Sequence, residues 1–259
     1  MTRRFFISAF VLLSTVAAYG QAAADAAATT ATAPAGVTAD SVARRAMDVL
    51  AGPAWDDARY FAFTFNVERE GQILASWKQQ WDRFSGDYAV SGRNRAGEEV
   101  RVVMNVNTKQ GRAWKNGKAE ADPAELLKFG YQRFINDTYW LLMGFKAFDP
   151  GVTRTYDGEK TDACGTVHDV VRFSFQNVGL TPGDVYWMWV NRRTGLVDEW
   201  HMKLEGSKPE DAPSVVAFHD YRRIGGLLIS TRREIRGRNQ FIRLDDVVVG
   251  REVARGAFE

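Results

Sequence analysis

The sequence has only one cysteine, Cys164, in 259 residues. A single thiol cannot form an internal disulfide, so a hydrophobic core has to stabilise the fold. A bacterial lipoprotein carries its lipid on a cysteine at the cleavage point, and Cys164 lies far downstream, so we expect no lipid anchor. Nothing in the surrounding stretch DACGTV is typical of an activated thiol, which favours an ordinary loop cysteine.

Histidine is almost as rare, with His168, His201 and His219 as its three copies. His168 and His219 each precede an aspartate, but neighbours on a strand point to opposite faces and do not form a dyad. A metal site needs three or four convergent ligands. The usual motifs for a nucleophilic serine, a zinc protease or a phosphate loop are also missing. We expect no enzymatic activity, no metal and no cofactor.

Neither sign of charge dominates the chain. It has 34 basic and 32 acidic residues, and the loss of Arg3 and Arg4 with a cleaved leader would leave 32 of each. Nucleic-acid binding needs a net basic surface, so this balance argues against such a partner.

The first residues have the pattern of a secretory signal peptide. Arg3 and Arg4 precede an apolar run at 5–18, which is about 14 residues long and too short to span a membrane. Small residues at 22–24 follow and resemble a cleavage site. We expect residues 1–24 to be removed and the mature protein to be periplasmic.

Residues 25–37 are mostly alanine and threonine, which predicts a flexible spacer. The remaining residues 38–259 suit a single domain, because no second linker divides them. Period-2 alternation and short turns predict an antiparallel meander of about 11 strands. The clearest strand, RYFAFTFNVE, places on one face Phe61, Phe63, Phe65 and Val67.

Two helical regions interrupt the strands. Residues 41–50 predict the first helix, with Asp40 as its N-cap. In the middle of the chain, a capping box at 122–125 predicts a helix to about Ile135. Residues 136–137 would then cap a separate short helix.

The short helix offers a cover for the sheet. A curled antiparallel sheet has a concave side that needs apolar residues against it, and strand 185–190 is apolar at every position, so both of its faces should be shielded from bulk water. Each large apolar side chain contributes roughly 1.5–3 kcal/mol on burial. We predict an α+β, mainly β fold, in which a curved antiparallel sheet forms an incomplete barrel and helices cover its concave face.

Three stretches resemble the LolA-like superfamily of periplasmic lipoprotein and lipid carriers, and in particular its outer-membrane lipoprotein-sorting branch. They are YWLLMGFKAFDPG at 139–151, VRFSFQNVGLTPGDVYWMWVNRRTGLVDEW at 171–200 and YRRIGGLLISTRRE at 221–234. The resemblance implies a half-barrel with a helical lid over a hydrophobic cavity for acyl chains. It also implies a latch arginine after an early strand tryptophan. Arg83 follows Trp81 in this way, although the family's next residue, proline, is Phe84 here.

The predicted site is the hydrophobic cavity and its lid. Aromatic side chains and adaptable methionines can repack around acyl chains. The residues expected to line it are Trp77, Trp81, Tyr139, Trp140, Leu142, Met143, Phe145, Trp187, Met188 and Trp189. A basic patch for anionic headgroups or an acidic partner is expected at Arg222, Arg232 and Arg236, with a merely solvated face as the alternative.

These features predict a monomeric, non-catalytic carrier that shields acyl chains of lipoproteins or lipids between membranes. Membrane-associated donor and acceptor proteins would be its partners. An envelope assembly factor with a permanently filled core is the second hypothesis. A hydrolase in a lipocalin-like cup, dependent on a histidine such as His201, is a weaker third.

Overall fold

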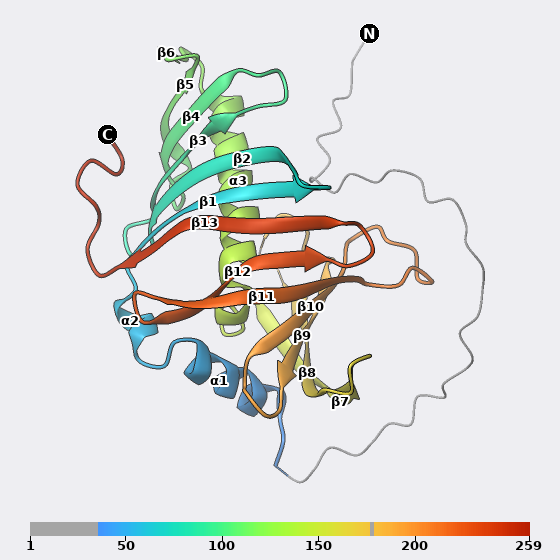
Figure 1. Ribbon diagram of the computed structural model, residues 1–259. Helices are drawn as coiled ribbons and strands as arrows, with labels where there is room; N and C mark the ends of the chain where they lie inside the picture. The colour runs from blue at the N-terminus through green and yellow to red at the C-terminus, as the bar shows by residue number, and fades with distance from the viewer. Residues whose placement is uncertain (1–35, 177–178) are drawn as a thin grey trace. The chain divides into compact units, whose positions relative to one another are not determined.

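The computed structural model describes residues 36–176 and 179–259, so the predicted signal peptide and most of the predicted spacer lie outside the described residues. Within these described residues, thirteen strands form one antiparallel sheet in the order β6-β5-β4-β3-β2-β1-β13-β12-β11-β10-β9-β8-β7 (Figure 1). The two edge strands, β6 and β7, do not pair with each other, so the sheet is curved but unclosed. This confirms the predicted fold class, with two strands more than expected.

The strands are β1 (Tyr60–Arg69), β2 (Gln72–Asp82), β3 (Asp87–Arg93), β4 (Glu99–Asn105), β5 (Gln110–Lys115), β6 (Lys118–Ala119), β7 (Val152–Thr161), β8 (Val167–Phe175), β9 (Val185–Asn191), β10 (Val197–Lys203), β11 (Ser214–Ile224), β12 (Leu227–Ile235) and β13 (Gln240–Gly250). The first and last of them pair with each other in the middle of the sheet.

The central strand β1 has the predicted alternation. Phe61, Phe63 and Phe65 are at most 2% exposed, and all three belong to the core. On the neighbouring strand β2, Trp81 lies opposite Phe61 and Trp77 lies opposite Phe65. Because directly opposed side chains share a face, both tryptophans are turned to the same side as the phenylalanines.

Helix α1 (Ala39–Leu50) begins two residues earlier than predicted and is capped by Thr38, not by Asp40. The Thr38 hydroxyl accepts a hydrogen bond from the Ser41 amide at 3.1 Å, and the Ser41 hydroxyl accepts one from the Thr38 amide at 2.9 Å. Serine at the third helical position completes this reciprocal cap. Asp40 lies in the first turn and forms an ion pair with Arg154 instead.

The prediction of two helices in the middle of the chain is wrong. Helix α3 (Ala124–Leu142) runs without a break and continues into the 3-10 turn η1 (Met143–Phe145). The N-cap is Pro123, and Asp122 accepts only a 3.3 Å hydrogen bond from the Ala124 amide. Asn136 and Asp137 do not cap a new helix, because Asp137 is fully buried in the helix and turned to the sheet.

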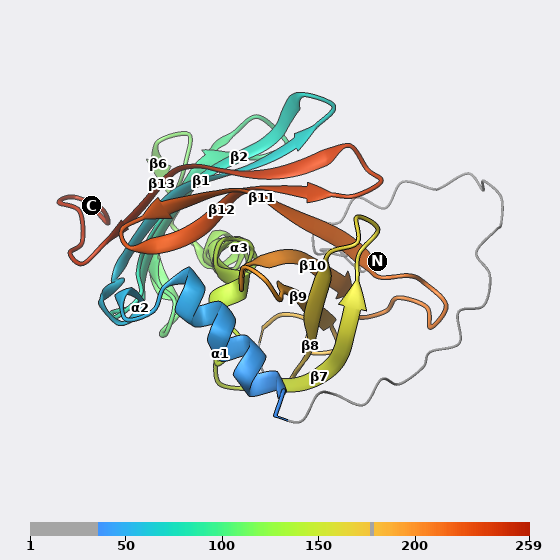
Figure 2. The ribbon, with the colours of Figure 1, turned by 60° about the horizontal axis from the view of Figure 1, so that its bottom comes forward.

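Helix α3 lies inside the curve of the sheet, and α1 lies along the open side (Figure 2). Gly130 brings α3 close to β4, since a Cβ atom at this position would be 2.8 Å from the Val102 Cγ1 atom. The predicted helical cover on the concave face is therefore present. The short helix α2 (Ala54–Asp57) connects α1 to β1.

The base of the β1–β2 hairpin depends on a carboxylate with a depressed pKa. Burial disfavours the charged form of Asp82, but hydrogen bonds from Arg59 and from the Phe84 and Ser85 amides outweigh burial and lower the pKa of Asp82 to about 2. A carboxyl group whose pKa is lower in the folded state stabilises the fold above its unfolded pKa, near 3.8. This contribution is lost as the pH falls to about 2.

We expect the Asp82→Asn variant to lose up to about 2 kcal/mol of stability at pH 7, reduced by solvent screening around the half-exposed Arg59. Its free energy of unfolding should also depend less on pH between about 4 and 2 than that of the wild type. Urea unfolding at a series of pH values measures both effects. Asp57→Asn, which removes the exposed pair with Arg251, is the matched control. Equal slopes for wild type and Asp82→Asn would contradict the assignment.

Candidate functional site

The candidate site is the interface between the concave face of the sheet and the lid, by which we mean α3 together with η1. The C-terminal part of the lid is the most deeply buried. Its large apolar residues with at most 9% exposure are Trp140, Leu141, Leu142, Met143 and Phe145. Four of these five are residues for which the sequence predicted a ligand-lining role.

An aromatic cluster joins this end of the lid to β8, β9 and β10. Trp140 packs edge-on against Trp200, with ring centroids 4.8 Å apart. Tyr139 lies 5.4 Å from Trp200, 5.5 Å from Tyr186 and 6.4 Å from Phe175. Trp200 is 2% exposed and was not among the predicted site residues, although its inward position follows from the alternation of β10.

The N-terminal half of the lid packs on the other end of the sheet. Phe129 lies 5.0 Å from Trp77, and Phe134 lies 5.2 Å from Trp81 and 5.3 Å from Tyr88. The structure therefore brings Trp77 and Trp81 together with α3. Aromatic pairs in these geometries add to the stabilisation from burial.

A buried polar group fixes the middle of α3 to the sheet. The Asp137 carboxylate forms an ion pair with Arg133 at 2.5 Å and accepts a hydrogen bond from the Gln79 amide. Gln79 in turn accepts a 2.6 Å hydrogen bond from the Tyr88 hydroxyl. Burial raises the pKa of Asp137, and the Arg133 charge opposes this effect. Arg133 also lies over the rings of Phe65 and Trp77, at 5.2 and 5.3 Å from their centroids.

A buried arginine holds the C-terminal end of α3. Arg233 of β12 is 2% exposed and donates a 3.1 Å hydrogen bond to the Leu141 carbonyl. Its guanidinium lies 4.1 Å from the Phe218 ring centroid. Its Nε and Nη1 atoms are buried and have no acceptor among the described residues. Burial lowers the pKa of Arg233 to about 10.

Arg83 does not hold the lid as the resemblance implied. It donates 2.7 Å hydrogen bonds to the carbonyls of Trp55 and Ala58, which fix α2. It reaches the lid only indirectly, because Trp55 stacks on Phe145 with centroids 5.1 Å apart. Arg233, not Arg83, donates a hydrogen bond directly to α3. Its signal in the sequence was parity, since Arg233 alternates in step with the buried Leu227, Ile229 and Ile235.

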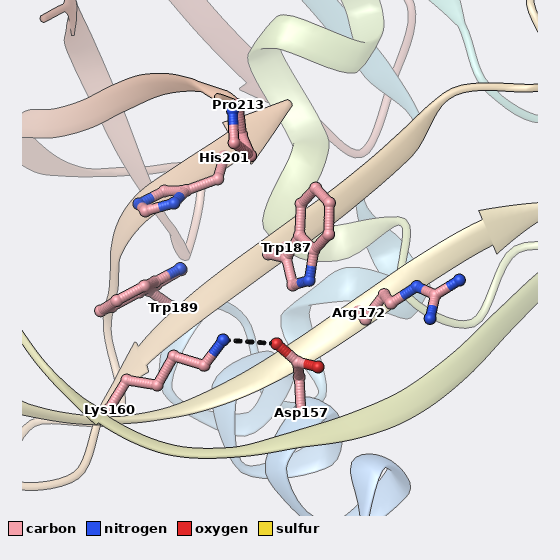
Figure 3. Close-up of a pocket in the computed structure, with 7 residues that line it drawn as sticks. All are labelled: Asp157, Lys160, Arg172, Trp187, Trp189, His201 and Pro213. Carbon is pink, nitrogen blue, oxygen red and sulfur yellow. Dashed lines mark hydrogen bonds and ion pairs between the residues drawn. The ribbon is translucent and has the colours of Figure 1, made fainter. Parts of the chain in front are cut away.

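The prediction that Trp187 and Trp189 line the interior is wrong. Met188 is fully buried in the core, so the two tryptophans lie on the opposite face of β9. They line a pocket of about 290 Å³ on that face, and Figure 3 shows their side chains there. The His201 ring stacks on Trp189 at 4.6 Å, and the Lys160 ammonium lies 6.0 Å from the same indole. These side chains shield the second face of β9, which explains its continuous apolar sequence.

All three histidines pair with carboxylates. His168 contacts Asp198 at 3.0 Å, His201 contacts Glu199 at 2.7 Å and His219 contacts Glu234 at 3.2 Å. In the described ranges, no group of three or more His, Cys, Asp or Glu side chains could hold a metal ion.

The predicted basic patch does not form as one surface. Arg236 pairs with the buried Glu199 of β10 at 2.7 Å. Arg222 and Arg232 line a separate hollow of about 670 Å³, where acidic side chains balance them: Asp220, Asp245 and Asp246. This hollow lies where β12 and β13 separate, since their pairing covers only 232–235 with 240–243. The surface is therefore of mixed charge.

No helix in the described ranges is both long enough and apolar enough to cross a membrane. No family model and no curated protein matches the sequence. Among solved structures, a DUF1329 family protein from Desulfovibrio piger is 13% identical, with a TM-score of 0.51 over 85% of this chain and 97% of that chain. The MucA/MucB complex from Pseudomonas aeruginosa gives 13% identity and a TM-score of 0.25, and the match covers 85% of this chain and 60% of that chain. The chain thus shares the fold of the DUF1329 protein.

Proposed function

We propose that this protein is an exported carrier of the LolA-like type, which shields an acyl chain by letting it replace the lid on the concave face of the sheet. The observation that supports this most directly is the nature of the interface. One continuous helix and one turn place a series of large, mainly aromatic side chains in the hollow of an unclosed sheet. A hydrocarbon chain could contact the same surface.

The energies make an exchange between lid and cargo reasonable. Burial of about 0.8 kcal/mol per methylene makes a C16 chain worth roughly 10 kcal/mol before ordering costs. An empty hollow of that size would be costly. The lid therefore fills the hollow in the absence of cargo, and the cargo competes with the lid for Trp200, Trp77 and Trp81. The signal-peptide pattern supports a periplasmic location, with membrane-associated donors and acceptors of the cargo as partners.

The test is direct binding of a fluorescent C16 fatty acid to the purified protein, together with mass spectrometry of molecules that copurify. We expect saturable binding that unlabelled palmitate competes away. Because lid and cargo compete, Trp140→Ala should weaken the lid and raise the affinity for the fatty acid several-fold, while it lowers the melting temperature. Trp114→Ala, at a partly exposed tryptophan of β5, is the matched control and should change neither value.

A filled interior also favours the second candidate, an interaction protein whose core is permanently occupied by the lid. Neither of the two hollows lies between the lid and the sheet, because no lid residue lines either of them. This candidate predicts a consistently bare protein without any uptake of the fatty acid, and an affinity that Trp140→Ala does not improve. Such a result would reject the carrier.

A further inference from the structure

Arg233 is a buried cation without a carboxylate partner in the described part of the chain. Its guanidinium lies over the Phe218 ring and donates a hydrogen bond to the Leu141 carbonyl, and the Tyr221 side chain is close enough to interact with it electrostatically. The Tyr221 hydroxyl is itself engaged, as it donates to the Val197 carbonyl at 2.7 Å. The negative end of the α3 dipole is therefore the main counter-charge for Arg233, because Leu141 lies in the last turn of that helix.

Displacement of the lid would change the surroundings of Arg233. When the lid leaves, Arg233 loses the Leu141 carbonyl and the helix dipole together. A hydrocarbon chain that takes the place of the lid offers the guanidinium nothing in return, and an uncompensated buried charge is strongly unfavourable. A ligand shifts an equilibrium only by its differential affinity for the two states. The cost of leaving this charge uncompensated would thus offset much of the favourable binding free energy of a purely apolar ligand.

We propose that the cargo is an amphiphile with an anionic head, and that Arg233 binds this head as a carboxylate or a phosphate. This inference rests on the proposed carrier function. The free Nε and Nη1 donors, together with the Nη2 donor that Leu141 releases, suit an oxyanion with two acceptor oxygens. No acidic side chain contacts the guanidinium in the described ranges, so no carboxylate there would repel an anionic head.

Matched ligands of equal chain length test this proposal. Dodecanoate and dodecanol are compared by isothermal titration calorimetry at pH 7.5, with the wild type and with Arg233→Met. Charge-assisted hydrogen bonds of the usual strength predict that the wild type binds dodecanoate roughly 10- to 100-fold more tightly than dodecanol. In Arg233→Met the preference should vanish, because the affinity for dodecanoate falls and the affinity for dodecanol does not. Arg232→Met, one residue away but stacked on Phe241 on the other face, should keep the wild-type preference.

The outcomes separate the two proposals. If neither ligand binds the wild type, the carrier function fails. If dodecanol binds as tightly as dodecanoate, the carrier function stands and the anionic head is rejected. A preference that persists in Arg233→Met also rejects the role of Arg233. Dodecyl phosphate should behave like dodecanoate. Acetate and inorganic phosphate at the same concentrations should not compete, and competition by either would point to a small-anion site and overturn the proposal for an amphiphile.

Discussion

Replacing Asp137 with leucine is expected to lower the free energy of unfolding by about 3–5 kcal/mol, because it leaves the Arg133 charge without its partner. The Arg133 side chain is only 14% exposed, and the Asp137 side chain is fully buried. The Gln79 amide would lose its acceptor as well. The reciprocal change, Arg133→Met, should cost a similar amount, since it leaves the carboxylate buried and unpaired. Urea unfolding of each variant measures these losses.

The double variant Arg133→Met/Asp137→Leu distinguishes an ion pair from simple packing. Removal of both charges should recover most of the lost stability, since well-packed apolar residues often replace a buried pair without cost. If the double variant loses the sum of the two single losses, the pair is not the cause. The exposed pair between Arg93 and Glu99 provides the control, and Glu99→Ala should cost less than about 1 kcal/mol.

Asp137 also shows why the sequence predicted the wrong helix boundaries. Asn136-Asp137-Thr138 is a good local cap, and local patterns were the only available guide. The partner that keeps Asp137 inside the helix, Gln79, is 58 residues away in the sequence. A tertiary contact of this kind overrides local preference and leaves no mark on the surrounding residues.

The strands were easier to predict than the identity of their faces. Alternation in β1 placed the three phenylalanines of that strand correctly, because one face is core and the other is partly polar. In β9 every residue is apolar, so the pattern could not show which residues face the lid. The outer face is covered by His201 and Lys160 from β10 and β7, and their contribution depends on strand pairing that the sequence does not reveal.

Arg233 was overlooked for a related reason. It lies in a run of basic residues that reads as a solvated strand, and a buried arginine without a carboxylate is rare. Its parity with Leu227 and Ile229 was the available signal. The resemblance to lipid carriers implies this role for Arg83 instead. In this chain the arginine after the early tryptophan holds α2, and the arginine that touches α3 comes from the far end of the sequence.

A disulfide between α3 and β4 is expected to reduce fatty-acid uptake at least tenfold and to release it on reduction. A Cβ atom at Gly130 would be 3.2 Å from the Val102 Cβ atom. Disulfides span Cβ distances of about 3.5–4.5 Å, so a shift of a few tenths of an ångström allows Gly130→Cys/Val102→Cys to close. The Cys164→Ser background removes the native thiol. Since α3 is continuous from 124 to 142, a bond at 130 restrains the helix as a whole.

The measurement compares one polypeptide in two redox states, which separates displacement of the lid from any damage caused by the substitutions. Thiol titration confirms closure, and binding of the fluorescent C16 fatty acid is followed before and after addition of dithiothreitol. Gly130→Cys alone, in the same background, controls for the effect of oxidant. If the closed disulfide leaves uptake unchanged, the acyl chain binds without moving α3. The pocket lined by Trp187 and Trp189 would then be the candidate binding site for the acyl chain, because no lid residue lines it.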